Sequence, residues 1–324
     1  MIITDCSAMF IKADDGSTYL FRTCDYERDL IKEGISFMSH SRDETLYLPI
    51  SKTALHSCHG FGGIAYPQKR TWLLDGLNDS GLSVAMLALD EGTSASVPEH
   101  GTCGVVGTEF TAYLLAMCSD TNEAAETAKK VTLLDIPDKT EHIKASMHFI
   151  VCDKNGNCIV LEATDKNAPG RISVYKNNGG ILTNSPPFND SISILHSFID
   201  SSDNTALKNS IAKSLPIDVK NKGCDSSKYS DLSYKSADRF IRLSVLAACA
   251  RLNGAFANKD CLSVGADIIG SVTEPPNGGL LNTKDSHTLY TVIYDLANSA
   301  QYSRMYGSLN WNRRIVPRYT CYTP

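Results

Sequence analysis

The sequence lacks the short motifs that identify several common enzyme classes. The patterns G-x-S-x-G, H-E-x-x-H and G-x-x-x-x-G-K-[ST] are all absent. A serine hydrolase with a nucleophile elbow, a zincin and a P-loop phosphotransferase therefore have no support. A G-x-G-x-x-G fingerprint is also absent, which disfavours a doubly wound dinucleotide-binding fold.

Long apolar runs and an excess of positive charge are missing too. No window approaches 18 uninterrupted apolar residues, and the opening MIITDCSAMFIKADDG has no basic or apolar region typical of a signal peptide. A cytoplasmic location without membrane insertion is therefore expected. The 31 Lys and Arg residues are interspersed among 36 Asp and Glu residues, for a formal charge of -5. No basic stripe results, so nucleic acid is not an expected partner.

Paired cysteine spacings are also absent. The 11 cysteines are odd in number and show no C-x-x-C pattern. This is typical of free thiols in a reducing compartment, and a disulfide framework or zinc site is not indicated. His56 and His59 have the appearance of ligands, but no second cluster stands at ligand spacing, which favours ordinary turn or pocket residues. No metal or other cofactor is expected.

The order of predicted elements indicates the fold class. Alternating residues around turn signals predict hairpins at 7–27, 71–89 and 145–164, and strand-turn-strand segments at 171–186 and 287–307. A helical period covers 107–131, with a new N-cap at Thr121 and Asn122, and another covers 236–253, capped by Ser236. Runs of strands and of helices without strict alternation indicate an α+β fold with a largely antiparallel sheet, packed in layers.

The length of 324 residues and the 42% hydrophobic content are sufficient for one large domain, and one is expected at 6–324. The stretch 201–235 is rich in Ser, Asp, Asn and Lys. We interpret it as a long surface loop or assembly arm with some helix.

Cys6 offers the clearest chemistry, since it stands at the start of the first predicted strand. A thiol on the first residue of a chain has its own base, because an α-amine with a pKa of about 7.7–8.0 can accept the thiol proton near neutral pH. Excision of Met1 alone does not expose Cys6. This chemistry therefore requires cleavage of the Asp5–Cys6 bond and loss of a leader, residues 1–5.

Arg22 and Asp25 lie three residues apart on the second strand of the first predicted hairpin, which returns them toward Cys6. A cation favours a thiolate, and a carboxylate can hold an amine. An Arg and an Asp near the end of a strand are most often surface charges, so this pair alone does not identify a site.

Five stretches together resemble the choloylglycine hydrolases, the family of bile salt hydrolases and penicillin V acylases. They follow the family's order and spacing across nearly the whole chain: CSAMFIKADDGSTYLFRTCDYE, LLDGLNDSGLSVAML, HFIVCDKNGNCIVLEAT, GGILTNSPPF and SADRFIR. The resemblance implies the four-layer αββα sandwich of N-terminal-nucleophile hydrolases, with two mainly antiparallel sheets.

The resemblance also implies roles for five residues. Cys6 is the nucleophile with its α-amine as base, Arg22 is the cation beside the thiol, and Asp25 is the carboxylate that contacts the amine. Asn184, in GGILTNSPPF, helps to hold the oxyanion, and Arg239, in SADRFIR, is a second arginine near the nucleophile. The family often forms homotetramers through an extended arm, for which 201–235 is the candidate.

Two departures from the family pattern affect the expected substrate. The family commonly has an asparagine or a tyrosine after the L-N-D-S-G-L turn, and this chain has Ala88 there. Alanine offers no side-chain donor to an oxyanion. Loss of one such donor typically lowers the rate by about 10²–10³. Asn184 and backbone N–H groups would then remain. The segment 133–143, which borders the acyl pocket in the family, is made polar by Asp138, Lys139 and Glu141.

The expected activity is hydrolysis of a linear amide, with conjugated bile salts ranked slightly above penicillin V. Amides of acyl-homoserine lactones or other lipids are a third choice. Two alternatives differ in kind. One is an acyltransferase, in which an amine replaces water as acceptor, and the other is a catalytically silent binding or assembly protein of the same fold.

Overall fold

The structure is a computed structural model that describes residues 6–26, 32–136, 146–201, 203–214, 233–257, 260–276 and 286–316. Three sequence predictions fall wholly or partly outside these ranges. They are the leader 1–5, the polar residues Asp138, Lys139 and Glu141, and residues 202 and 215–232 of the candidate arm.

Sheet I is antiparallel and has six strands in the order β14-β1-β2-β15-β16-β17. β1 and β2 form the predicted first hairpin, and β15 and β16 form the predicted last one. The strands are Ile181–Thr183 (β14), Ser7–Lys12 (β1), Thr18–Tyr26 (β2), His287–Asp295 (β15), Ala300–Met305 (β16) and Asn312–Ile315 (β17).

Sheet II is also antiparallel and has seven strands in the order β13-β12-β11-β8-β7-β6-β3. The predicted hairpins at 71–89 and 145–164 are its central pairs. The strands are Ser173–Lys176 (β13), Cys158–Glu162 (β12), Met147–Asp153 (β11), Leu82–Ala88 (β8), Leu73–Asn78 (β7), Phe61–Ala65 (β6) and Ser36–His40 (β3).

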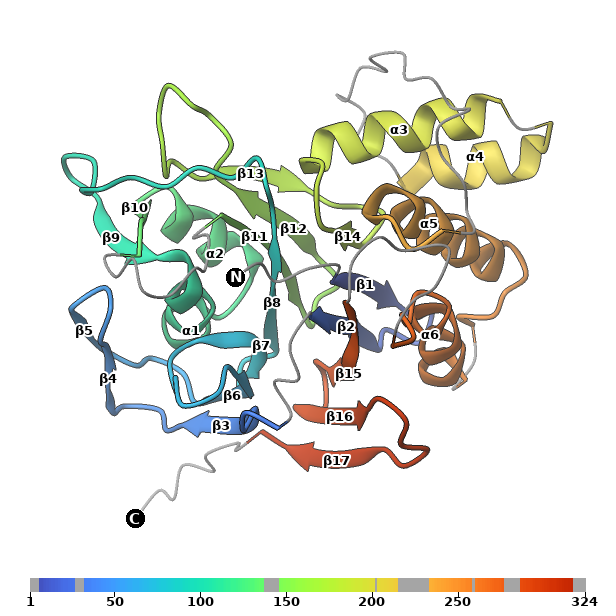
Figure 1. Ribbon diagram of the computed structural model, residues 1–324. Helices are drawn as coiled ribbons and strands as arrows, with labels where there is room; N and C mark the ends of the chain where they lie inside the picture. The colour runs from blue at the N-terminus through green and yellow to red at the C-terminus, as the bar shows by residue number, and fades with distance from the viewer. Residues whose placement is uncertain are drawn as a thin grey trace.

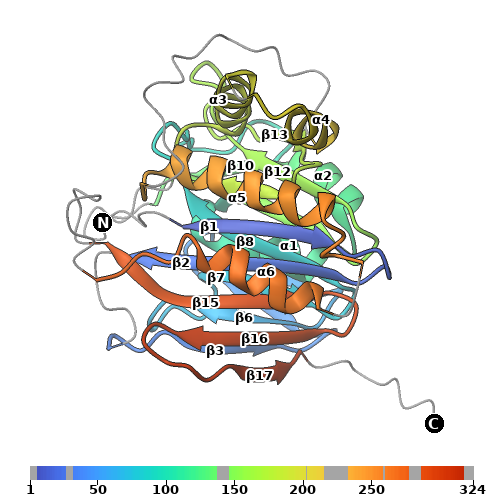
Figure 2. The same cartoon turned by 90° about the vertical axis from the view of Figure 1, so that its right-hand side faces the viewer.

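Helices cover the outer faces of the two sheets, so the molecule has four layers (Figure 1). α1 (Gly107–Met117) and α2 (Thr121–Ala128) pack on sheet II, and α5 (Ser236–Leu252) and α6 (Cys261–Gly270) lie across sheet I (Figure 2). Two further helices, α3 (Phe188–Asp200) and α4 (Thr205–Ser214), pack on α5. The remaining strands form the hairpin of β4 (Thr45–Leu48) and β5 (Thr53–His56) and the parallel pair of β9 (Cys103–Val106) and β10 (Val131–Leu134).

The alternation of apolar and polar residues in β2 does not separate core from solvent. Every residue of β2 except Tyr19 is buried, including Arg22, Thr23 and Asp25. The reason is the layering, because one face of sheet I meets sheet II and the other meets α5 and α6. The polar residues of β2 therefore lie inside the protein, where each needs a partner.

The segment 171–186 does not form a hairpin within one sheet. β13 is an edge strand of sheet II and β14 is an edge strand of sheet I, so the chain crosses between the sheets at the turn that joins them. The side chain of Asn177 holds this turn, accepting from the N–H of Gly180 at 2.9 Å. Gly180 has φ +74, and an added Cβ would lie 2.4 Å from the carbonyl oxygen of Phe10. Because of this crossing, β14 pairs with β1.

Two predicted helix caps were wrong in detail. α2 is capped by Asp120, whose side chain accepts from the N–H groups of Asn122 and Glu123. Ser236 is the first residue of α5 and makes no capping bond. Its hydroxyl instead lies 3.0 Å from that of Thr183, a contact that ties α5 to β14.

Among the described residues, no helix has both the length and the apolar character needed to cross a membrane.

Candidate active site

The site is built around the first residue of the described chain. Ser7 pairs with Thr23 of β2 on one side and with Thr183 of β14 on the other. Continuing both registers by one residue places Cys6 between Cys24 and Asn184. Side chains of directly opposite residues in antiparallel strands lie about 4.5–5.5 Å apart at Cβ. Sheet geometry alone therefore brings Cys24 and Asn184 to the nucleophile candidate.

Arg22 supplies the cation on the thiol side. Its Nη2 lies 3.5 Å from the Sγ of Cys6 and donates to the carbonyl oxygen of Met86 at 3.1 Å. Its Nη1 donates to Asp75 of β7 and contacts the hydroxyl of Tyr290 of β15. The side chains of Arg22 and Asp75 have no exposed surface. A buried guanidinium is tolerated because this buried carboxylate compensates its charge.

The surroundings of Cys6 favour its ionised form. A hydrogen bond from the thiol of Cys24 is the largest cause that lowers the pKa of Cys6, burial opposes it, and the charge of Arg22 and the backbone N–H of Asp25 lower it further. The resulting pKa is about 6. A thiol with this pKa is mainly thiolate at neutral pH, which is the reactive form.

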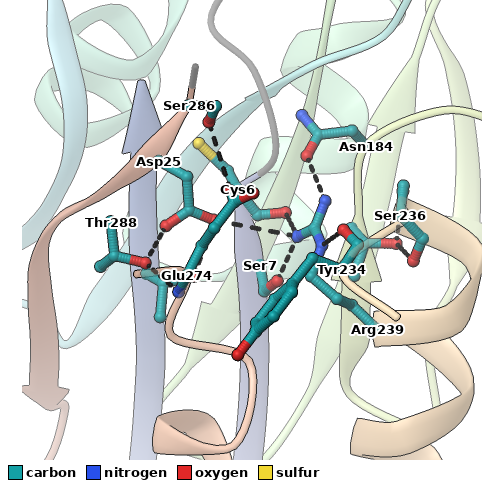
Figure 3. Close-up of polar contacts among 12 residues, drawn as sticks. Cys6, Ser7, Asp25, Asn184, Tyr234, Ser236, Arg239, Glu274, Ser286 and Thr288 are labelled. Atoms are coloured by element: carbon teal, nitrogen blue, oxygen red, sulfur yellow. Dashed lines mark hydrogen bonds and ion pairs between the residues drawn. The ribbon is translucent and has the colours of Figure 1, made fainter. Parts of the chain in front are cut away.

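Arg239 of α5 reaches the backbone of Cys6 from the helix side of sheet I (Figure 3). Its Nη1 donates to the carbonyl oxygen of Cys6 at 2.7 Å and to the hydroxyl of Ser7, and its Nη2 donates to Oδ1 of Asn184 at 3.2 Å. Its Nε donates to the carbonyl oxygen of Tyr234 at 2.9 Å. Arg239 thus fixes the start of β1 and orients Asn184.

Asp25 lies on the same side of sheet I as Arg239, with 4.0 Å between its Oδ2 and the Nη1 of Arg239. Its Oδ1 accepts from the hydroxyl of Thr288, and that hydroxyl also accepts from the N–H of Glu274 at 2.8 Å. Burial raises the pKa of Asp25 well above its usual value, while the charge of Arg239 opposes this rise. A positive charge close by would therefore stabilise the ionised carboxylate.

Ala88, the doubtful position of the oxyanion region, contributes an acceptor in this structure. The Nδ2 of Asn184 donates to the carbonyl oxygen of Ala88 at 3.0 Å. The N–H of the next residue, Leu89, donates to the carbonyl oxygen of Ser146 at 3.0 Å. The side-chain amide of Asn184 is thus held between Ala88 and Arg239. Its Nδ2 can donate to an oxyanion only after its hydrogen bond to the carbonyl oxygen of Ala88 is broken.

The structure brings together the five residues assigned by resemblance, from the residue before β1, from β2 and α5, and from the residue after β14. Sequence reasoning missed Cys24, Asp75 and Tyr290. Asp75 had a visible signal, since it is an acidic residue inside the apolar strand LLDGLN. Cys24 and Tyr290 had none, because their role depends on strand register and on contacts between distant strands.

His56 and His59 lie away from this site and make ordinary polar contacts. His56 is 3.6 Å from Asp43, and the Nδ1 of His59 is 2.9 Å from the hydroxyl of Ser80 and 3.4 Å from Asp79.

Comparison with known proteins identifies a family for nearly the whole sequence. Residues 6–314 match the family described as linear amide C–N hydrolases, choloylglycine hydrolase family. An uncharacterized protein of Paramecium bursaria Chlorella virus 1 is 24% identical over 323 residues, which cover 94% of this chain and 98% of that protein. The bile salt hydrolase/transferase of Clostridium perfringens (strain 13 / Type A) is 26% identical over 197 residues, which cover 60% of this chain and 57% of that protein.

Solved structures of related enzymes share the fold. A conjugated bile acid hydrolase variant from Clostridium perfringens aligns with a TM-score of 0.76 at 21% identity, covering 96% of this chain and 92% of that one. Penicillin V acylase from Agrobacterium tumefaciens aligns with a TM-score of 0.70 at 16% identity, covering 95% and 85%. These likenesses confirm the predicted α+β fold with mainly antiparallel sheets.

Proposed function

The chain belongs to the choloylglycine hydrolase family of linear amide C–N hydrolases, and from this premise we propose that it hydrolyses an N-acyl amide with Cys6 as its nucleophile. In this proposal, residues 1–5 are first removed by cleavage of the Asp5–Cys6 bond. Cys6 then becomes the first residue of the chain and gains a free α-amine.

The observation that carries the proposal is the contact between Arg22 and Cys6. The guanidinium lies 3.5 Å from the sulfur in a site where both side chains are fully buried, and the pKa of Cys6 is lowered to about 6. A buried thiol with no function ordinarily has a raised pKa, because burial disfavours the thiolate. Cys118 illustrates this, since burial raises its pKa to about 11.

The proposed reaction has two stages. The Cys6 thiolate attacks the carbonyl carbon of the amide, and the tetrahedral intermediate collapses to a thioester as the C–N bond breaks and the α-ammonium gives a proton to the leaving nitrogen. Water, deprotonated by the same amine, then hydrolyses the thioester and frees the acid. Asp25 and Arg239 keep the amine and the backbone of Cys6 in position.

Asn184 is the proposed donor to the oxyanion. Its Nδ2 is paired with the carbonyl oxygen of Ala88, so oxyanion formation would exchange one acceptor for a charged one. Hydrogen bonds to charged acceptors are about twice as strong as neutral ones, which favours this exchange in the transition state.

For the substrate, we propose a conjugated bile salt, with glycine or taurine as the leaving amine. The names of several relatives support this choice, and the polar residues at 138, 139 and 141 count against it. Penicillin V, favoured by the fold match to its acylase, is the second candidate. Other lipid amides, including those of acyl-homoserine lactones, come third.

A substrate panel tests the proposal. Purified protein is incubated with glycocholate, taurocholate, penicillin V and an acyl-homoserine lactone, and the released amine is measured. We expect release from at least one of them and its loss in Cys6→Ser. Release that persists in Cys6→Ser would contradict the proposal.

The same panel separates the alternatives. An acyltransferase would form a new amide when a competing amine is added, a possibility suggested by the word transferase in the names of two relatives. A silent binding protein would release no amine from any member of the panel while still binding one of them.

A further inference from the structure

A second thiol lies against the proposed nucleophile. Cys24 stands directly across from Cys6 when the register that pairs Ser7 with Thr23 is continued by one residue. Both cysteines are completely buried. Cys24 also lies two residues from Arg22 on β2, so the two side chains project from the same face of the strand. Cys6, Cys24 and Arg22 therefore share one closed compartment between the sheets.

The contacts in this compartment decide which sulfur carries the negative charge. Arg22 Nη2 is hydrogen-bonded to the sulfur of Cys6, and the backbone N–H of Asp25 lowers the pKa of Cys6 further. Cys24 lies directly opposite Cys6 in that register, and burial, followed by a hydrogen bond with Cys6, raises the pKa of Cys24 well above its usual value. Cys6 is therefore the anion. Cys24 stays protonated, and its S–H can donate a hydrogen bond to the Cys6 sulfur.

The proximity of Cys24 to Cys6 matters for the proposed removal of residues 1–5. Before residues 1–5 are removed, the nitrogen of Cys6 is part of a peptide bond and cannot accept a proton. Whatever ionises Cys6 in that chain must be a fixed donor or cation in its surroundings. Among the described residues, Arg22 is hydrogen-bonded to the sulfur, and the thiol of Cys24 and the backbone N–H of Asp25 also lower the pKa of Cys6.

We propose that Cys24 is a positioning residue whose thiol donates a hydrogen bond to the Cys6 sulfur across β1 and β2 and holds that sulfur as a thiolate before the α-amine exists. The inference rests on the proposed function, in which Cys6 is the nucleophile. It adds a donor that acts through Cys6 alone and does not touch the substrate.

The test is a pH titration of the Cys6 thiolate, followed by its ultraviolet absorbance as the difference between each protein and its Cys6→Ala counterpart, under reducing conditions. In the full chain kept uncleaved, we expect half-ionisation at about pH 6. Cys24→Ala should raise this midpoint by about one to two pH units, the usual value of a hydrogen bond to a charged group. Cys24→Ser, which keeps a donor, should recover most of the shift.

A matched control is Cys118→Ser, which alters another buried thiol, on the outer side of sheet II. It should leave the midpoint unchanged. The inference is overturned if Cys24→Ala titrates like the parent protein or if Cys24→Ser behaves like Cys24→Ala. It is also overturned if, in the spectra before subtraction, the thiolate absorbance disappears in Cys24→Ala and persists in Cys6→Ala.

Because the readout is ionisation, it is independent of turnover. A Cys24-dependent midpoint in a protein that hydrolyses no amide would preserve the inference and remove the proposed function. If the protein is active, the rate of leader loss near pH 6, followed by intact mass, should fall about tenfold or more in Cys24→Ala and be restored in Cys24→Ser.

Discussion

The two ends of β1 differ in how their polar groups are held. At the start of the strand, Cys6 is surrounded by buried charges, and Arg22, Asp25 and Arg239 are all hydrogen-bonded within the site. At the other end, a cavity of about 810 Å³ opens beside Lys12. It is lined also by Lys176 and Arg251, by turn residues such as Asn178 and by Cys158.

The far cavity is spacious but poorly organised for chemistry. Lys12 and Lys176 are exposed, and the ammonium of Lys12 donates to the carbonyl oxygen of Asn155. The thiol of Cys158 lies 3.4 Å from that of Cys152, with no cation at hydrogen-bond distance among the described residues. Reactive groups need fixed partners that shift their pKa, and the start of β1 supplies these.

Loss of the nucleophile should have the largest effect on activity. Cys6→Ala is expected to reduce amide hydrolysis by at least about 10⁴-fold, as removal of a covalent nucleophile does elsewhere. The matched control is Cys58→Ala, which removes an exposed thiol and should leave the rate unchanged. Amine release by both variants checks this, and appreciable turnover by Cys6→Ala would locate the chemistry elsewhere, with the far cavity as the next candidate.

The carboxylate behind Arg22 should matter most for stability. Asp75 accepts from Arg22, Tyr290 and Tyr294. Asp75→Asn leaves a buried guanidinium without a compensating charge, which typically costs about 3–5 kcal/mol. Urea unfolding measures this cost. Glu126→Gln, which breaks an exposed pair with Lys129, is the control and should leave the midpoint unchanged; equal midpoints for the two variants would contradict the account.

Removal of the proposed oxyanion donor should have an intermediate effect. Asn184→Ala is expected to lower kcat by about 10²–10³ with a smaller change in KM. Asn178→Ala removes an exposed amide at the far end of β1 and should behave as the parent protein. If kcat is the same in Asn184→Ala and the parent, the amide of Asn184 has a structural role only, as its contact with Ala88 already suggests for the resting state.

The smallest effect is expected at the far end itself. The double change Lys12→Ala and Lys176→Ala alters exposed side chains, and surface changes typically alter stability by no more than about 0.5 kcal/mol. The rate should therefore stay close to that of the parent protein. Steady-state kinetics on the substrate found in the panel provides the check. A loss of tenfold or more would show that the far cavity communicates with Cys6 or binds part of the substrate.

The contrast between the two ends also explains what the sequence could reveal. The proximity of Arg22 and Asp25 to Cys6 could be predicted because the three residues belong to one hairpin, whose register follows from its turn. Asn184 and Arg239 came from the resemblance, since only packing joins β14 and α5 to β1. The crossing between sheets at Asn177 and Gly180 was not predicted, because a strand-turn-strand pattern does not state which sheet each strand enters.

The partners of Arg22 could not be predicted from the sequence for a related reason. Asp75 and Tyr290 come from different sheets, more than fifty and more than two hundred residues away along the chain. Such contacts are set by tertiary packing, and periodicity within a segment contains no information on them. The burial of both faces of β2 is a similar case. Alternating apolar and polar residues are equally typical of a strand with one face in water, so the pattern alone does not predict that both faces are covered.

The central claim is that Cys6 acts as an N-terminal nucleophile, and the most direct test is the intact mass of the purified protein, measured on the sample assayed for hydrolysis. The account predicts an active sample whose mass lacks residues 1–5, and an uncleaved sample without activity. Equal turnover by a chain that still carries residues 1–5 would contradict it, because the nitrogen of Cys6 would then be an amide and could not serve as the base.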